Sequence, residues 1–230
     1  MASRRSADRL IASGAVRVNG KVPPPAGLLI DPERDRVTVE GQDVEPPAAH
    51  SYIAINKPAG VIVSASDERG RPTVFDLVGS EAGPGRLFAV GRLDMDTHGL
   101  LLLTDDGELA NRLAHPSYKV AKEYLATVTG LPGERDLRTL ATGVRLEDGR
   151  TQPAEVELVG TARGLAQVRL VLREGRNRQV RRMLEAVGHP VRDLQRTAFG
   201  PLRLGRLKEG DWRRLRQPEV EALRRAAKLD

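Results

Sequence analysis

Acidic side chains gather at a change from apolar to polar character in the stretch VGRLDMDTHGLLLLTDDGELANRLAHP, residues 90–116. Asp94 stands at the junction between an apolar segment and a short polar break that precedes four leucines. A carboxylate at such a junction can project from a rigid scaffold into a cleft and act as a base or nucleophile. The alternative is that Asp94 only caps the next turn. Asp96, Asp105 and Asp106 compete for a carboxylate role, and the last two better fit the turn TDDGE that caps a following helix.

The charge distribution indicates a polyanionic partner. The chain of 230 residues has a net charge of +6, and residues 161–230 hold 18 Lys and Arg against 8 Asp and Glu. The remaining residues hold 19 against 23, so the basic surplus is concentrated in the C-terminal third. Arginine dominates there, and its planar guanidinium matches phosphate oxygens. The competing explanation is an Arg-rich, Ala-rich composition that reflects a GC-rich genome and a solvated surface.

Composition also excludes several classes of chemistry. The chain contains no cysteine, which rules out disulfides, thiolate metal sites and a cysteine nucleophile. The histidines are scattered without the spacing of metal ligands, so we expect no metal and no cofactor. Neither a membrane span nor a signal peptide is visible, which predicts a soluble cytoplasmic protein. The four histidines are His50, His98, His115 and His189.

The first 45 residues predict a small separate domain. Ser3 can cap a short helix that ends at Gly14, and VRVNGK then indicates a strand, an Asn-Gly turn and a second strand. A further strand is expected around residues 37–39, and the prolines of GQDVEPPAAH mark a linker near residues 41–50. We therefore predict domains at residues 1–45 and 50–230.

Residues 50–230 predict a mixed, mainly antiparallel α+β domain. Neither a regular strand–helix alternation nor a Gly-rich phosphate loop is present, which disfavours a nucleotide-binding α/β fold. The predicted strands are YIAIN, GVIVSAS, RLFAVGRL, LLLLT, EYLATVTG, AEVELVG and AQVRLVLREG, and the predicted helices are TVFDLVG, GELANRLAH, ERDLRTLATG, RQVRRMLEAVG and a final one from Pro218.

Four ordered segments carry a resemblance to a known family. GRLDMDTHGLLLLTDDG resembles the catalytic motif of pseudouridine synthases of the RsuA/RluB family. INKPAGVIVS (residues 55–64), KEYLATVTG (122–130) and the segment 172–215 resemble the family's other motifs, so the resemblance spans the chain. GELANRLAHP is more similar to the large-subunit enzymes than to the small-subunit one. The resemblance implies isomerisation of a uridine to pseudouridine in 23S ribosomal RNA or an assembly intermediate.

The resemblance also implies roles for three residues. Asp94 becomes the catalytic carboxylate, Tyr124 the aromatic ring packed on the target base, and Arg181 the ion-pair partner that keeps Asp94 ionised. Tyr124 is otherwise explained as an ordinary residue of a half-buried strand, and Arg181 as one more solvated arginine. An ionised carboxylate could attack the anomeric carbon of the ribose or remove the neighbouring proton to form a glycal, and the sequence does not choose between these.

Basic side chains of both predicted domains are expected to bind RNA. The family carries a small RNA-binding domain at its N-terminus, with a helix before the ASRR segment, so we expect this chain's domain to lack that first helix. No heptad pattern indicates a dimer, which predicts a monomer. The expected RNA-binding residues are Arg4, Arg5, Arg9, Arg17, Lys21, Arg92, Arg176, Arg178 and Arg182.

Two other classes compete with the isomerase. A non-catalytic RNA-binding or ribosome-assembly factor would keep the basic surface without the chemistry, although the set of Asp94, Tyr124 and Arg181 argues against it. A glycoside hydrolase would need two carboxylates and an aromatic-rich cleft, and aromatic residues make up only 3% of the chain. The sequence does not identify the target uridine, because RNA shape decides it.

Overall fold

The computed structural model describes residues 4–24, 27–31, 34–44, 49–79 and 87–229. Contacts within the chain divide it into two units, Met1–His50 and Ser51–Asp230. The boundary follows His50, at the end of the linker predicted near residues 41–50. Residues 45–48 of that linker fall outside the described residues. Each unit is considered by itself.

The N-terminal unit consists of one helix and a small antiparallel sheet. Helix α1 (Arg4–Ala12) ends before Gly14, whose φ of 73° is easily reached only by glycine. Strands β1 (Val16–Val18), β2 (Val37–Val39) and β3 (Gln42–Asp43) pair in that order. Asn19 and Gly20 both have positive φ, as the predicted Asn-Gly turn requires. The predicted cap Ser3 lies outside the described residues, as do the side chains of Arg4 and Arg5.

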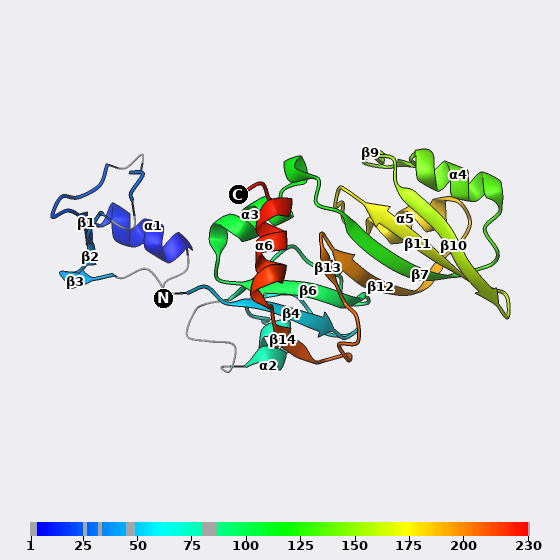
Figure 1. The fold of residues 1–230 in the computed structure, drawn as a ribbon, viewed down its shortest axis with the longest axis horizontal. Helices are drawn as coiled ribbons and strands as arrows, with labels where there is room; N and C mark the ends of the chain where they lie inside the picture. The colour runs from blue at the N-terminus through cyan, green and yellow to red at the C-terminus, as the bar shows by residue number, and fades with distance from the viewer. Residues whose placement is uncertain (1–3, 25–26, 32–33, 45–48, 80–86, 230) are drawn as a thin grey trace. The chain divides into compact units, whose positions relative to one another are not determined.

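The larger unit is built on one mixed sheet, drawn in Figure 1. Within the described residues the strand order is β10-β11-β7-β12-β6-β4-β14, with β13 paired to β12 and β5 paired to β6. All of these pairs are antiparallel except β12 with β6. The strands are β4 (Tyr52–Lys57), β5 (Phe88–Ala89), β6 (His98–Thr104), β7 (Lys122–Thr129), β10 (Glu155–Ala162), β11 (Leu165–Leu172), β12 (Val191–Phe199), β13 (Leu202–Arg203) and β14 (Trp212–Arg214), with β8 (Arg145–Leu146) and β9 (Gly149–Arg150) forming a separate hairpin.

Helices cover the sheet, and their ends carry the expected capping residues. The Asp106 side chain accepts a hydrogen bond from the Leu109 amide at 3.0 Å, which confirms the capping turn predicted from TDDGE. Thr73 and Asp76 form a capping box at the start of the next helix upstream. The helices are α2 (Val74–Val78), α3 (Gly107–Ala114), η2 (Pro116–Tyr118), α4 (Glu134–Thr142), α5 (Gln179–Ala186) and α6 (Gln217–Ala226).

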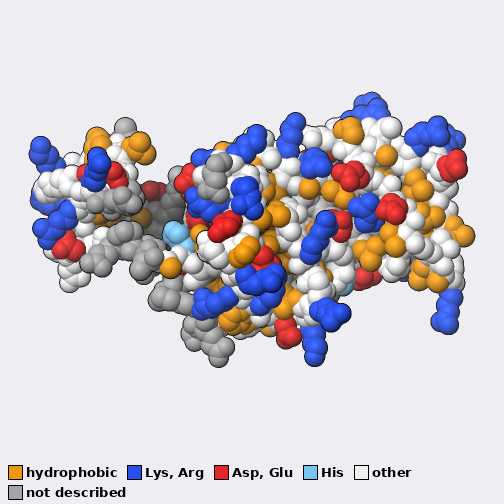
Figure 2. Space-filling view, in the orientation of Figure 1, with side chains coloured by type: hydrophobic (Ala, Val, Ile, Leu, Met, Phe, Trp, Pro, Cys, Tyr) orange, Lys and Arg blue, Asp and Glu red, His pale blue; other side chains and the backbone are white. Residues whose placement is uncertain are grey.

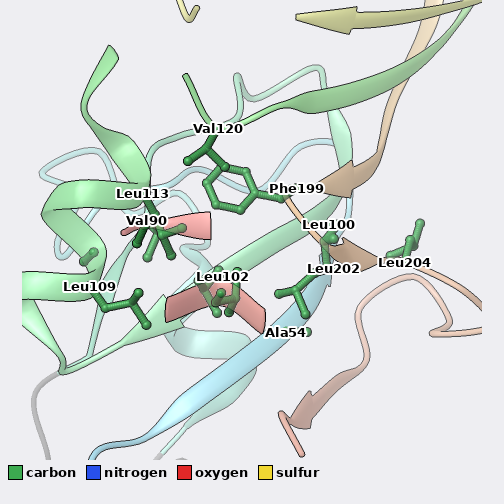
Figure 3. Close-up of a cluster of buried hydrophobic side chains, with 13 residues drawn as sticks. Ala54, Val90, Leu100, Leu102, Leu109, Leu113, Val120, Phe199, Leu202 and Leu204 are labelled. Carbon is green, nitrogen blue, oxygen red and sulfur yellow. The ribbon is translucent and has the colours of Figure 1, made fainter. Parts of the chain in front are cut away.

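Strand β6 separates two apolar clusters of the core. Leu100 and Leu102 face a cluster that includes Leu109 and Leu113 of α3, which Figure 3 shows converging beneath Phe199. Leu101 and Leu103 alternate onto the opposite face and pack against α2. Because successive side chains of a strand point to opposite faces, four consecutive leucines give a strand that is buried on both sides. This strand anchors the chain immediately after the segment that contains Asp94.

A third cluster holds the other end of the sheet. Side chains of β7 and β11, including Val128 and Val168, pack against Leu140 of α4 and Met183 of α5. In Figure 1 these two helices lie at the end of the sheet formed by β7, β11 and β10. The start of α5 is thereby fixed against the same strands that carry Tyr124.

The observed fold confirms the predicted α+β class with a mainly antiparallel sheet. Several predictions of individual strands differ from the structure. After the Asn-Gly turn the predicted second strand of VRVNGK is reduced to one bridge, between Val18 and Lys21, and the predicted strand RLFAVGRL is observed only at Phe88–Ala89. The segment GVIVSAS, residues 60–66, is not a strand, because Gly60 turns the chain at a φ of 85° and only one bridge, Ile62 with Thr73, pairs it. Strand β12 was not predicted, although it lies in the middle of the sheet. It carries several polar residues, and so lacks the apolar run that marked the other central strands.

Candidate active site

One cavity of about 250 Å³ lies in the larger unit, where strands of the sheet meet two of the segments that connect its elements. Its walls come from the segment that leads into β6, from β7, from the turn between β11 and α5, and from β12. Asp94 and Tyr124, two of the three predicted catalytic residues, both line it. Arg181, the third, is not among the lining residues.

Asp94 is held in a short turn whose neighbours are buried. Leu93 and Thr97 are only 6% and 2% exposed, and the Thr97 amide donates to the Asp94 carbonyl oxygen at 3.1 Å. The Asp94 side chain itself is 37% exposed. The backbone is therefore fixed on both sides while the carboxylate reaches the cavity, which is the arrangement expected of a reactive group on a rigid support.

The expected ion pair between Arg181 and Asp94 is wrong for this structure. Asp96, two residues farther along, occupies Arg181 instead: the Arg181 Nη2 donates to the Asp96 carbonyl oxygen at 2.6 Å, and its Nε lies 3.3 Å from the Asp96 carboxylate. The physical reason is the turn itself, which points the backbone carbonyl and carboxylate of Asp96 toward α5. Arg181 thus holds the segment that carries Asp94 rather than the Asp94 carboxylate.

Arg178 is the cation beside both acids. Its two terminal nitrogens each donate to one Asp96 oxygen at 3.0 Å, and its Nη1 lies 4.0 Å from Asp94 Oδ2. Arg178 precedes α5 with a φ of 48°, a left-handed conformation that costs a non-glycine residue about 1 to 2 kcal/mol. Such strain persists where surrounding contacts enforce it, and here it directs the guanidinium between the two carboxylates.

The charges of these arginines govern the ionisation of Asp96. Burial raises the pKa of Asp96, but the hydrogen bond from Arg178 and the charges of Arg181 and Arg178 outweigh burial and hold that pKa below its usual range. Asp96 is therefore ionised at neutral pH and binds the guanidinium groups of Arg178 and Arg181. Its role in the site could have been suspected from its spacing to Asp94, but not its partners.

Tyr124 lies in the middle of β7 with its ring on the cavity face. Its partner on β11 is Leu170, and its partner on β12 is Arg196. The side chain is half-buried and packs against two of the apolar clusters. The strand prediction for this residue is confirmed, and the exposed part of the ring faces the same cavity as the carboxylate of Asp94.

Three cations in or beside the cavity, two of them buried, were missed by the sequence analysis. Lys57 is completely buried at the end of β4, where its Nζ donates to the Pro58 carbonyl oxygen at 2.7 Å. Burial lowers the pKa of Lys57 to about 8, although the negative charges of Asp96 and Asp94 oppose the shift. Lys122 and Arg196 line the cavity itself.

The arginines expected to bind RNA differ in how far other contacts occupy them. Arg92 is exposed and lines the cavity. Arg176 lines it too, but its guanidinium donates to the carbonyl oxygens of Asp148, Gly149 and Arg150. Arg182 forms a two-pronged pair with the Asp148 carboxylate at 3.0 Å and does not line the cavity. Contacts within the protein therefore hold Arg176 and Arg182 in place.

The arginine surplus does not form a continuous basic patch on the face drawn in Figure 2. Blue and red side chains alternate there over the larger unit. Several arginines of the C-terminal third are paired with glutamates, for example Arg169 with Glu157 at 2.8 Å and Arg213 with Glu219 at 2.7 Å. In the smaller unit Arg9, Arg17 and Lys21 are exposed. Net charge alone thus overstates the number of cations available to a polyanion.

Two kinds of feature are absent from the described residues: a cluster of metal ligands and a helix able to cross a membrane. No group of three or more His, Asp or Glu side chains in residues 4–24, 27–31, 34–44, 49–79 and 87–229 could hold a metal ion. Within the same ranges, every helix is too short or too polar to cross a membrane.

This chain is similar to known proteins in both fold and sequence. A crystal structure of a pseudouridylate synthase superimposes with a TM-score of 0.71 at 34% identity, covering 96% of this chain and 94% of that one. The fold is thus that of an RNA-modifying isomerase. A family model described as RNA pseudouridylate synthase matches residues 51–186, which contain Asp94, Tyr124 and Arg178. The chain belongs to the RNA pseudouridine synthase family.

Two relatives align over nearly the whole chain. An RNA pseudouridine synthase of Mycobacterium tuberculosis, itself described as uncharacterised, is 46% identical over 230 residues, covering 100% of this chain and 91% of the relative. The ribosomal large subunit pseudouridine synthase B of Bacillus subtilis is 45% identical over 229 residues, covering 99% and 92%. Because both alignments extend through the N-terminal unit, the similarity includes residues outside the catalytic fold.

Proposed function

We propose that this enzyme converts one uridine of large-subunit ribosomal RNA to pseudouridine in the cavity beside Asp94. The observation that supports the proposal best is the shared cavity of Asp94 and Tyr124, with Arg178 within 4.0 Å of the carboxylate. The choice of RNA rests on the Bacillus subtilis relative, whose name assigns it to the large ribosomal subunit.

Asp94 supplies the negative charge that the reaction needs at the ribose. The bond between C1′ of the ribose and N1 of the base breaks, and the electron-poor sugar is met by an ionised carboxylate. That carboxylate either bonds to C1′ or removes the proton from C2′ to give a glycal. Both routes use the carboxylate of Asp94 as an anion, and the guanidinium of Arg178 lies 4.0 Å from that carboxylate.

Tyr124 offers an aromatic face to a base turned out of its RNA stack. Flipping a nucleotide costs a few kcal/mol, and stacking on an aromatic ring returns about 1 to 3 kcal/mol. Tyr124 of β7 lines the same cavity as Asp94. Its position on a strand of the central sheet keeps the ring orientation fixed while the base turns.

Basic side chains outside the catalytic pair guide the RNA. Arg92 and Arg178, exposed or half-exposed at the cavity, contact phosphates beside the target nucleotide, while Arg176 and Arg182 chiefly support the protein structure around it. Residues 1–45 form a small RNA-binding domain whose exposed Arg9, Arg17 and Lys21 add further contacts to RNA. The enzyme acts as a monomer in the cytoplasm, where ribosomal RNA is made, since its sequence has no heptad pattern that would indicate a dimer.

A label-release experiment tests the proposal. Ribosomal RNA carrying tritium at C5 of uracil is incubated with the full chain, and tritium released into water is counted. Isomerisation makes C5 the glycosidic carbon, so each turnover releases one label. We expect release from 23S RNA and none from 16S RNA. Asp94→Asn should abolish release while RNA affinity changes little, because phosphate contacts supply most of that affinity.

Asp211→Asn is the matched control, since it removes an equal charge from an exposed position of the same domain. It should release label at the wild-type rate. RNA binding by the wild-type chain without any label release would show a non-catalytic RNA-binding protein instead. Loss of binding together with activity in Asp94→Asn would assign Asp94 a structural role.

A further inference from the structure

Two cations in the cavity have no part in the reaction described so far. Arg196 of β12 is the cross-strand partner of Tyr124, so both side chains point to the same face of the sheet. Lys122 lies two residues before Tyr124 on β7 and shares that face as well. All three line the cavity. The wall that carries the stacking ring therefore also carries two positive charges.

Arg196 is buried with one of its donors unused. The residue is 1% exposed, and its Nε donates to the Leu100 carbonyl oxygen at 2.7 Å. Its Nη2 is buried and has no hydrogen-bond partner among the described residues. A buried donor without a partner costs about 1 to 3 kcal/mol, and more when it is charged. An acceptor that enters the cavity would recover that cost.

Lys122 increases the positive charge at the same place. The Lys122 Nζ lies 5.8 Å and the Arg196 Cζ 5.2 Å from the centre of the Phe199 ring. Burial lowers the pKa of Lys122, and the charge of Arg196 lowers it further. In the described part of the chain, neither cation has a carboxylate within 4.0 Å. The unfavourable burial of two like charges is relieved by a ligand that brings negative charge.

The reaction itself generates such a ligand, if the function proposed above is correct. When the bond between C1′ and N1 breaks, its electron pair stays on the base and spreads from N1 onto the two carbonyl oxygens. The base is then a uracil anion that turns within the cavity. Its C5 next attacks the ribose and the new carbon–carbon bond forms, after which the hydrogen on C5 leaves as a proton and N1 takes up a proton, so the product is an isomer of the substrate. No other co-reactant is required.

We propose that Arg196 and Lys122 bind the detached uracil as an anion and stabilise its charge while it turns on Tyr124. Donors fixed in advance around developing negative charge lower a barrier most where water is excluded, as at this buried wall. The phosphate backbone is a poorer candidate for these cations, because Arg196 lines the cavity and is only 1% exposed. A flipped base reaches such a depth.

The acidity of the leaving base provides the test. Two otherwise identical RNA substrates carry uridine or 5-fluorouridine at the target, and fluorine makes the departing base more acidic and its anion more stable. Under single-turnover conditions with saturating enzyme, loss of the starting nucleoside is followed by nuclease digestion and chromatography. We compare the wild type with Arg196→Met and Lys122→Met, which remove the charge and keep an unbranched apolar side chain.

We expect Arg196→Met to slow the reaction of uridine about 10²- to 10³-fold, the usual effect of removing one donor to a developing anion. Lys122→Met should slow it about tenfold. With 5-fluorouridine the loss in Arg196→Met should shrink about tenfold and the loss in Lys122→Met should nearly vanish, since that base needs less stabilisation. Lys119→Met, which removes an exposed lysine outside the cavity, should match the wild type on both substrates.

Several results would overturn the inference. Equal losses on the two bases would assign the cations a structural role, and weaker RNA binding with a reduced salt dependence would assign them to phosphate. If Arg196→Met does not fold, Lys122→Met decides the question, because its side chain lies at the start of a strand and is only partly buried. A wild-type chain that consumes neither substrate would contradict the proposed function instead.

Discussion

Replacing Lys57 by methionine measures what a fully buried ammonium group costs this fold. Burial lowers the pKa of Lys57 from 10.5 to about 8, and the charges of Asp96 and Asp94 recover only part of that cost. Below pH 8 the lysine is protonated in both the folded and the unfolded chain. Between pH 8 and pH 10.5 the unfolded chain binds the proton and the folded chain does not, so the free energy of unfolding rises with pH.

The size of the effect follows from the difference between the two pKa values. A gap of roughly 2.5 units corresponds to about 3 kcal/mol, since each unit is worth 1.36 kcal/mol. The wild type should therefore gain about 3 kcal/mol in stability relative to Lys57→Met as the pH rises through this window. Urea unfolding of both proteins at half-unit intervals of pH measures it, and the subtraction cancels the titration of all other groups.

Lys119→Met serves as the control, because Lys119 is exposed. Its difference from the wild type should not change across the window. A flat difference for Lys57→Met would refute the reasoning, since it would mean that the buried lysine titrates as it does in the unfolded chain. A difference that falls with rising pH would mean that attraction to the site carboxylates exceeds the cost of burial.

Two further predictions concern backbone packing and an ion pair. Gly99→Ala should destabilise the fold by more than about 2 kcal/mol in urea unfolding, because φ is 108° and a Cβ would overlap the backbone carbonyl oxygen of Arg196. Gly160 has open space around it, so Gly160→Ala should lose far less stability. Hydrogen bonds from Arg213 lower the pKa of Glu219 to about 2. The stability that Glu219 contributes is therefore complete above about pH 4.5 and is lost as the pH falls toward 2. In acid titrations, the advantage of the wild type over Glu219→Gln should disappear over that interval, and a constant advantage would contradict this assignment.

Local patterns predicted the elements that carry the candidate site. Four consecutive leucines specified a strand buried on both faces, and that strand fixes the position of Asp94. The alternation in KEYLATVTG specified the strand of Tyr124. These predictions succeeded because they depend on side-chain periodicity within a few residues, which the sequence states directly.

Pairing across the chain was harder to predict. Arg181 was expected beside Asp94, but a turn of two residues brings Asp96 to Arg181 and leaves Arg178 nearest to Asp94. Arg178, Arg181 and Arg182 are equivalent candidates when only the sequence is considered. Which of them meets a given carboxylate depends on backbone angles, such as the positive φ of Arg178, that no local pattern specifies.

Burial of charged residues was also missed, though one signal was available. In VRDLQRTAF, Leu194, Arg196 and Ala198 alternate with more exposed residues, so a period of two puts the arginine on the apolar face. Composition rules place arginine and lysine outside, and an arginine on such a face contradicts them. A conflict between residue type and periodicity is the kind of inconsistency that functional sites produce.

The parallel pairing of β6 with β12 has a consequence for how the enzyme matures. His98 lies opposite Gln195 in that pairing, so nearly a hundred residues of chain must be gathered before the two strands meet. Contacts between such distant segments form late, because the entropy of closing the intervening chain is lost first. A growing polypeptide would already contain Asp94 and Tyr124 while one wall of the pocket is still unmade. The ability to modify RNA is thus gained only when the domain is complete, and partly folded chains do not modify their substrate.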